Sequence, residues 1–160
     1  MQGYIKVGDF EGESSDEGHK GWSQLESFSA PLSQSVGAYA HGDSKAKVLV
    51  TLGDISIVKA LDSSSVKIQR ALVNREQVPK VEIHLCGVVS NNREPFLVYE
   101  LADVFVTSYS FSAQIVANAS PPTESVSFSF KKIKWTYSQI GTDGKKQGKV
   151  FHEHRVGEFK

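Results

Sequence analysis

The segment GESSDEGHKGW, residues 12–22, gathers acids, serines and a histidine, which are the residue types that supply a hydrolase with its nucleophile and general base. Such an assembly needs a nucleophile on a strained turn, a base within hydrogen-bond reach and an oxyanion hole. The sequence contains no G-x-S-x-G nucleophile elbow and no phosphate-binding glycine pattern. We therefore interpret the segment as a structural loop.

Four side chains of this segment are expected to fix its shape, while its glycines permit a tight turn. Glu13 and Asp16 are expected to accept hydrogen bonds from backbone amides or from His19. Trp22 is expected to supply an apolar anchor. The hypothesis is that His19 pins the loop onto its own subunit or onto the next one.

Two further histidine patterns are candidates for metal binding. His152 and His154 flank Glu153, and on a strand both imidazoles would share one face. No third ligand is evident near them, and the segment is close to a polar terminus. His84 shares a strand face with Cys86, but a zinc site would need more thiolates and a second spaced pair. We predict no metal, no cofactor and no enzymatic activity.

The segment KKIKWTY, residues 131–137, interleaves lysines with aromatic residues. This pattern suits single-stranded nucleic acid, because bases stack on aromatic rings and phosphates pair with lysines. A small OB-like barrel could bind nucleic acid in this way through Lys131, Lys132, Lys134 and Trp135. Eighteen basic residues balance eighteen acidic ones, so no net charge attracts nucleic acid. We favour a strand with a buried aromatic face, and nucleic-acid binding remains the alternative function.

The composition is that of one globular domain over residues 1–160. The chain is 39% hydrophobic and 22% charged, an ordinary mixture for a domain of this length. The single cysteine, Cys86, cannot form an intramolecular disulfide. The N-terminal residues do not resemble a classical signal peptide, and no apolar run approaches the roughly 20 residues of a membrane span. We expect no stable membrane insertion and, if the protein is exported, export by a dedicated machine.

Alternation of apolar and polar residues dominates the chain and predicts strands. The polar, glycine-rich residues 137–160 are expected to form an exposed C-terminal extension. The prediction is a mainly β fold, a small barrel or sandwich of two sheets with one flanking α-helix. The expected strands cover residues 4–10, 24–30, 47–58 (one strand, or a pair with a turn at Gly53-Asp54), 81–86, 96–111 and 125–137, and a long loop covers 33–45.

One helix is predicted over residues 62–73. Asp62 or a following serine can cap it by accepting the free amide hydrogens of the first turn. Val66 and Val73 fall at helical spacing, with Ile68 beside them, so an apolar face is present but mixed with polar residues.

Residues 125–137 carry large side chains at even positions first and at odd positions afterwards, from Phe128 to Ile133 and Trp135. Since successive residues of a strand face opposite sides, this change moves the apolar set to the other face. It predicts a β-bulge or a strand that crosses between two surfaces. The alternative is a strand buried on both faces, one in the core and one against another subunit.

Five segments occur in the order of motifs found in one protein family. Together they resemble the haemolysin-coregulated protein (Hcp) family, the tube protein of the type VI secretion system. The resemblance runs from about residue 4 to residue 137. The segments are GESSDEGH at 12–19, SFSAPLSQ at 27–34, DISIVKALDSSSVKI at 54–68, LADVFVTSY at 101–109 and PTESVSFSFKKIKWTY at 122–137.

The resemblance implies a small β-barrel of two sheets with a helix at its side. It also implies homo-hexameric rings that stack into a hollow tube, with a valine-glycine-repeat spike protein at the tip and a contractile sheath around it. Effector proteins would be bound and chaperoned in the lumen. The protein would reside in the bacterial cytoplasm before assembly and would then be secreted through the type VI system.

The resemblance also suggests site residues. Ser29 matches a serine that faces the lumen in the family, and Ser27 shares its face by period two, so both are candidate cargo-facing residues. Ala30-Pro31 departs from the Trp-Gly of many members, and the strand must end or kink there because proline cannot donate a ladder hydrogen bond. The loop after Gln34 also departs from the family pattern. Its candidate ring-stacking residues are Val36, Tyr39, His41, Asp43 and Lys45.

Overall fold

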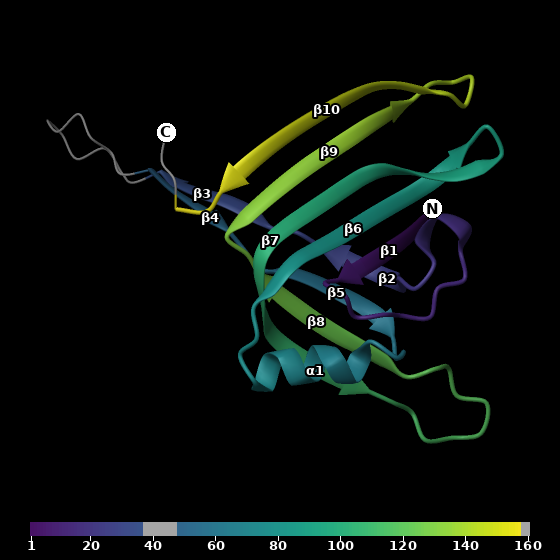
Figure 1. Cartoon of the computed structure of the whole chain (residues 1–160), viewed down its shortest axis with the longest axis vertical. Helices are drawn as coiled ribbons and strands as arrows, with labels where there is room; N and C mark the ends of the chain where they lie inside the picture. Colours follow the sequence, from purple (N-terminus) through teal and green to yellow (C-terminus); the bar gives the residue numbers. More distant parts are fainter. Residues whose placement is uncertain (37–47, 158–160) are drawn as a thin grey trace, which may run out of the picture.

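A computed structural model describes residues 1–36 and 48–157 of the chain (Figure 1). Strands make up most of it, accompanied by one α-helix and one turn of 3-10 helix. The elements are β1 Gln2–Val7, η1 Glu17–His19, β2 Ser23–Ser29, β3 Leu32–Val36, β4 Val48–Leu52, β5 Ile55–Ala60, α1 Ser65–Val73, β6 Val78–Val89, β7 Asn92–Ser112, β8 Thr123–Ser129, β9 Lys132–Ile140 and β10 Lys146–Arg155.

The main sheet has eight strands in the order β10-β9-β7-β6-β1-β2-β5-β8, and β8 also pairs with β7. This last pairing closes six of the strands into a small barrel. Strands β9 and β10 extend the sheet outward from β7, and β10 is its outermost strand (Figure 1). Strands β3 and β4 form a separate hairpin. The predicted mainly β, barrel-like fold with one helix is confirmed.

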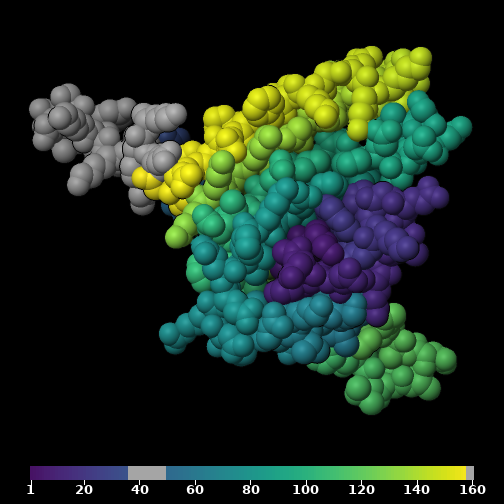
Figure 2. All heavy atoms as spheres, viewed as in Figure 1, coloured from purple at the N-terminus to yellow at the C-terminus, as the bar shows by residue number. Residues whose placement is uncertain are grey.

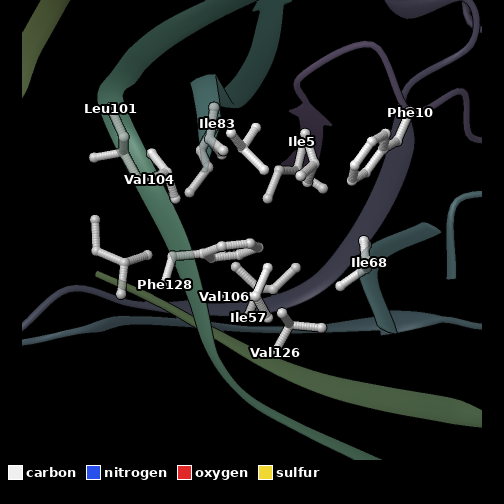
Figure 3. Packing of buried hydrophobic residues seen from close by; sticks show 14 of the residues in the cluster. Ile5, Phe10, Ile57, Ile68, Ile83, Leu101, Val104, Val106, Val126 and Phe128 are labelled. Carbon is white, nitrogen blue, oxygen red and sulfur yellow. The ribbon is translucent and has the colours of Figure 1, made fainter. Parts of the chain in front are cut away.

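The core lies inside the barrel, where alternate residues of each strand meet (Figure 3). On β5, Ile55 and Ile57 are each 1% exposed, and on β8, Val126 and Phe128 are equally buried. Each fully buried aliphatic or aromatic side chain of this kind contributes about 1.5–3 kcal/mol through removal of apolar surface from water. The period-two pattern of the sequence therefore becomes the inward face of the barrel.

Helix α1 begins close to its predicted start. The Asp62 Oδ1 atom accepts a hydrogen bond at 2.9 Å from the backbone amide of Ser64, the N-cap residue that directly precedes the helix. Ile68 is fully buried on the side of the helix that packs against β7, while Val66 and Val73 are 74% and 72% exposed. The two valines at helical spacing therefore belong to the solvent face, and the inward stripe runs through Ile68.

The expected single strand over 125–137 is two strands, β8 and β9, separated at Phe130 and Lys131. Strand β8 lies between β5 and β7 in the barrel, whereas β9 lies between β7 and β10 in the extension. The chain thus leaves the barrel at this break while remaining alongside β7. The interpretation of the parity change as a crossing between two surfaces is confirmed, and its description as one continuous strand is corrected.

Strand β7 changes parity at the same place as its neighbour. Phe128 of β8 pairs with Val106, and Ile133 of β9 pairs with Leu101, and all four side chains are buried. Between the two pairs, Asp103 of β7 adopts a left-handed conformation with φ of 53°. In both strands the apolar side chains therefore change from one face to the other at the same place. The core thus continues from the barrel into the region where β9 leaves it.

Three further boundaries differ from, or refine, the sequence prediction. Residues 47–58 form a pair, β4 and β5, with the turn at Gly53-Asp54. Strand β2 ends at Ser29, before Pro31, and the start of the predicted 33–45 loop belongs to strand β3. The predicted exposed extension begins inside β9, where Ser138 is buried, and it continues into the ten-residue strand β10, which is largely exposed and paired with β9. Period-two alternation missed β10 because its apolar residues, Val150 and Phe151, are adjacent rather than two positions apart.

Candidate functional site

The 12–22 loop is closed onto itself by its backbone. The amides of Gly12 and Ser14 donate to the carbonyls of Gly21 and Trp22, both at 2.8 Å. Gly21 has φ of 77°, a conformation in which a side chain would be strained. Within the loop, η1 carries His19 inward until only 3% of the residue is exposed.

The imidazole of His19 is enclosed by two aromatic rings. It stacks on Tyr4 of β1 with ring centroids 4.3 Å apart and an interplanar angle of 6°. Trp22 contacts it edge to face at 4.9 Å. Glu13, expected to work beside Asp16, is instead exposed and forms no hydrogen bond or ion pair with any residue in the described part of the chain. Of the two predicted acidic residues, Asp16 is therefore the one that contacts His19.

A chain of polar groups runs through His19. Its Nδ1 atom lies 3.0 Å from the Oδ2 atom of Asp16, and its Nε2 atom lies 2.9 Å from Nδ1 of His84 on β6. Because a carboxylate can only accept, Nδ1 of His19 carries the proton. In the neutral pair, Nε2 of His19 therefore accepts a hydrogen bond donated by His84. Arg93 of β7 donates to Oδ1 of Asp16 at 2.8 Å and completes the chain.

The pKa values of these groups reflect the same contacts. The hydrogen bond from His19, reinforced by Arg93, lowers the pKa of Asp16. Burial, together with the nearby His19, lowers the pKa of His84 to about 4. Burial raises the pKa of the Cys86 thiol to about 11. At neutral pH the site therefore holds an ionised aspartate, an uncharged His84 and a protonated thiol.

Cys86, His19 and Asp16 approach the arrangement of a cysteine-nucleophile triad, with the Sγ atom 3.9 Å from Nε2 of His19. Two features oppose that chemistry. The Nε2 atom that would act as the base is already hydrogen-bonded to His84, and the thiol is buried with a raised pKa, which disfavours the nucleophilic thiolate. The arrangement is suited to holding the loop against β1 and β6.

A second polar cluster, which the sequence analysis did not identify, lies at the start of α1. The Nζ atom of Lys59 on β5 is fully buried and contacts the carboxylate of Glu124 on β8, which is buried as well. Lys59 also donates to Asp62 at 2.8 Å and to Ser65 at 3.3 Å. Tyr109 of β7 donates a hydrogen bond to the same Glu124 carboxylate. The cluster ties α1 to three strands of the barrel.

A signal for this cluster was present in the sequence. Lys59 continues the inward series of Ile55 and Ile57, and Glu124 precedes the inward series that contains Phe128. Each charged residue therefore occupies a position where alternation demands an apolar one. The structure pairs them in register across β5 and β8, and a buried charge requires such a partner.

The two candidate cargo-facing residues lie on a face built from hydroxyl side chains. Ser27 and Ser29 are both exposed on β2. Ser29 pairs with Ser56 of β5, and Ser56 in turn pairs with Ser127 of β8, with their two hydroxyl oxygens 2.9 Å apart. The row continues to Ser108 of β7. We call this surface the serine face; its members are Ser27, Ser29, Ser56, Ser108, Ser110, Ser125 and Ser127.

The candidate ring-stacking residues fall mainly outside the described residues. Tyr39, His41, Asp43 and Lys45 all lie within 37–47. Val36 is the last residue of β3, where it pairs with Val48 of β4.

The residues of the alternative nucleic-acid site do not share a surface. Lys132 and Lys134 face the side of β9 opposite to Trp135, which packs against the core. Both lysines also have acidic neighbours, because Lys132 lies 2.7 Å from Glu153 and Lys134 lies 3.9 Å from Glu100. Lys131 is in the connection before β9. The four predicted residues therefore do not present a stacking ring and free cations on one face.

The candidate metal ligands are also distributed. His152 of β10 stacks on Trp135, with ring centroids 5.8 Å apart, and His154 pairs with Ile133. Over residues 1–36 and 48–157, no group of three histidine, cysteine or acidic side chains converges on a common point. In the same residues, no helix has the length and apolar character needed to cross a membrane.

Both the sequence and the fold of this chain match a known protein family. Residues 4–137 match the family model described as type VI secretion system effector, Hcp. The chain belongs to the Hcp family. The match covers most of the chain and includes the 12–22 loop, the serine face and α1. A direct sequence comparison with curated proteins returns no match.

Solved structures of Hcp proteins share this fold. A structure described as a type six secretion system protein superposes with a TM-score of 0.85 at 25% identity, covering 97% of this chain and 95% of the other. Hcp1 from Salmonella typhimurium gives 0.73 at 21% identity, covering 96% and 93%. A type VI secretion system effector from Yersinia pestis gives 0.73 at 19% identity, covering 96% and 99%.

Proposed function

We propose that this Hcp-family protein is a structural tube component of a type VI secretion system, rather than an enzyme. In the proposal, six copies form a ring, rings stack into a hollow tube, and the tube carries effector proteins. The observation that carries it is the family match over residues 4–137. A site in which the one thiol is buried and protonated agrees with a structural role.

The serine face supports a place for cargo. Its hydroxyl groups can both donate and accept hydrogen bonds, and they are carried by small side chains on a continuous sheet. Ser27 and Ser29, the candidate cargo-facing residues, contribute one strand of it. Such a face can bind a protein surface and still release it, because each neutral hydrogen bond contributes only about 0.5–1.5 kcal/mol.

The remaining partners follow from the same proposal. A tube of this kind would contact a valine-glycine-repeat spike protein at its tip and a contractile sheath on its outside. The protein would fold in the cytoplasm and leave the cell when the sheath contracts. Deletion of the sheath gene should then abolish its appearance in the culture medium while leaving its level inside the cell unchanged.

The first test is the native mass by light scattering on a sizing column, with negative-stain imaging of the peak. Ring-shaped hexamers would support the proposal, and a strict monomer across micromolar concentrations would contradict it. The second test places a charge on the serine face. Ser29→Arg should keep the ring and reduce retention of a co-expressed effector, whereas Ser120→Arg, at an exposed serine outside that face, should alter neither.

A further inference from the structure

Strand β10 is an edge of the main sheet in the part of the chain that the structure describes. It pairs with β9 on one side, and no other strand of the described residues pairs with its outer side. In the space-filling view, it forms the outer margin of the molecule (Figure 2). An exposed edge strand of ten residues presents a row of backbone donors and acceptors that can pair with another strand.

The two faces of β10 are both apolar near its middle. Val150 is 73% exposed on one face, and Phe151 is 67% exposed on the other. Lys149 and Glu153 flank Phe151 on its own face, two residues before and two residues after it. An isolated edge strand is usually protected by charges, a proline or a bulge near its middle, but here the middle is apolar and the charges are to either side.

Two β10 edges could pair antiparallel about a two-fold axis in several registers. Residues opposite each other must point to the same face, so each register determines which charged side chains meet. With the axis at Phe151, each Lys149 lies opposite a Glu153, and this favourable pair occurs twice. With the axis at His152, Lys149 lies opposite Arg155, and like charges repel. Parallel in-register pairing opposes each charge with its own copy. An axis at His154 would also oppose Glu153 with Arg155, but it would overlap only the last three residues of β10. Charge pattern and overlap together therefore favour the register centred on Phe151.

We propose that the β10 edge binds the β10 edge of a second copy of this chain, antiparallel and centred on Phe151. In that arrangement the two Phe151 rings lie together on one face. On the other face, Val150 of each copy lies opposite His152. The contact has two-fold symmetry, so it cannot generate a six-membered ring by itself, and it would join two rings or two unassembled copies. It is therefore a different contact from the one that closes a ring.

A symmetric disulfide tests the register directly. Directly opposite residues of an antiparallel pair have Cα atoms about 4.5–5.5 Å apart, within the range of a disulfide. Phe151→Cys should therefore cross-link two chains under mild oxidation. Val116→Cys is a matched control, because Val116 is also 67% exposed but lies outside β10. The native Cys86 is buried and should not take part.

Pairing holds the two introduced thiols at a millimolar effective concentration, so Phe151→Cys should cross-link at least about tenfold faster than Val116→Cys. Lys149→Glu in the Phe151→Cys background places two carboxylates opposite each other, the introduced one and that of Glu153, and should reduce the rate to that of the control. Adding Glu153→Lys restores opposite charges and should recover the rate. Thermal unfolding of each variant verifies that it is folded.

Equal rates for Phe151→Cys and Val116→Cys would overturn the proposal. Because Glu153 also pairs with Lys132, failure of the charge exchange to recover cross-linking overturns it when the variant unfolds at the same temperature as Phe151→Cys. The native mass of the reduced protein separates this proposal from the ring. Hexamers without the β10 cross-link would leave the ring proposal intact and reject the two-fold contact. A cross-link in the absence of hexamers would support the two-fold contact alone.

Discussion

The Nε2 atom of His19 lies 2.9 Å from the Nδ1 atom of His84, although the two residues are 65 positions apart in the chain. One belongs to the 12–22 loop and the other to β6. Only one proton fits between these two nitrogens, so one ring donates the hydrogen bond and the other accepts it. The contact attaches the 12–22 loop to β6.

The first prediction concerns pH. The pKa of His84 is about 4 in the folded protein and 6.5 without the fold, so the unfolded chain binds the proton more readily between these values. Stability should therefore fall as pH decreases from 6.5 to 4, by about 3 kcal/mol at 1.36 kcal/mol per pKa unit. The groups that act on His84 are His19, Glu82, Glu100 and Lys80.

Urea unfolding at a series of pH values measures this effect. His84→Gln should flatten the stability profile between pH 6.5 and 4. Identical slopes for the wild-type protein and His84→Gln would contradict the prediction.

The second prediction concerns the loop itself. His19→Ala removes a buried ring that bonds Asp16 and His84 and stacks on Tyr4. It should lower the free energy of unfolding by about 2–4 kcal/mol, since it creates a cavity and leaves buried polar groups without partners. Urea titration at pH 7.5 measures the loss. Unchanged stability together with intact hexamers would reject the hypothesis that His19 holds the loop in place.

The third prediction concerns the buried ion pair. Lys59→Met leaves the Glu124 carboxylate buried without its cation and should cost about 3–5 kcal/mol. The double change Lys59→Met and Glu124→Leu removes both charges and should recover much of this loss. Chemical denaturation of the single and double variants gives the comparison. A double variant less stable than the single one would show that the pair has a further role.

The fourth prediction distinguishes the two faces of α1. Ile68→Ala should cost about 2–4 kcal/mol because Ile68 is fully buried against the barrel. Val66→Ala removes a side chain that is 74% exposed and should change stability by less than about 0.5 kcal/mol. Thermal unfolding of both variants tests the assignment, and equal losses would contradict it.

Local patterns in the sequence predicted much of this fold. Alternation marked the barrel strands, and helical spacing together with Asp62 marked α1, because both signals depend on residues close together in the chain. Pro31 marked the end of β2 for the same reason, since the missing amide hydrogen is a property of that residue alone. The change of parity near residue 130 predicted where the chain leaves the barrel. The order of five motifs predicted the family.

Local patterns were wrong, or silent, where a residue's role depends on a distant partner. Val66 and Val73 share helical spacing, but only the packing of α1 on β7 decides that Ile68 faces inward. The apolar residues of β10, Val150 and Phe151, are adjacent and face opposite sides, so they give no alternating pattern, and pairing with β9 decides that the segment is a strand.

The sequence by itself determined which residues alternate, where the helix starts and which family the chain belongs to. Only the tertiary structure decided that His19 contacts His84 and that Lys59 contacts Glu124. The sequence shows that Lys59 and Glu124 each occupy a position in an apolar series, but it does not show that they contact each other. Partners are set by the register between strands that are remote in sequence, and that register is established when the barrel closes.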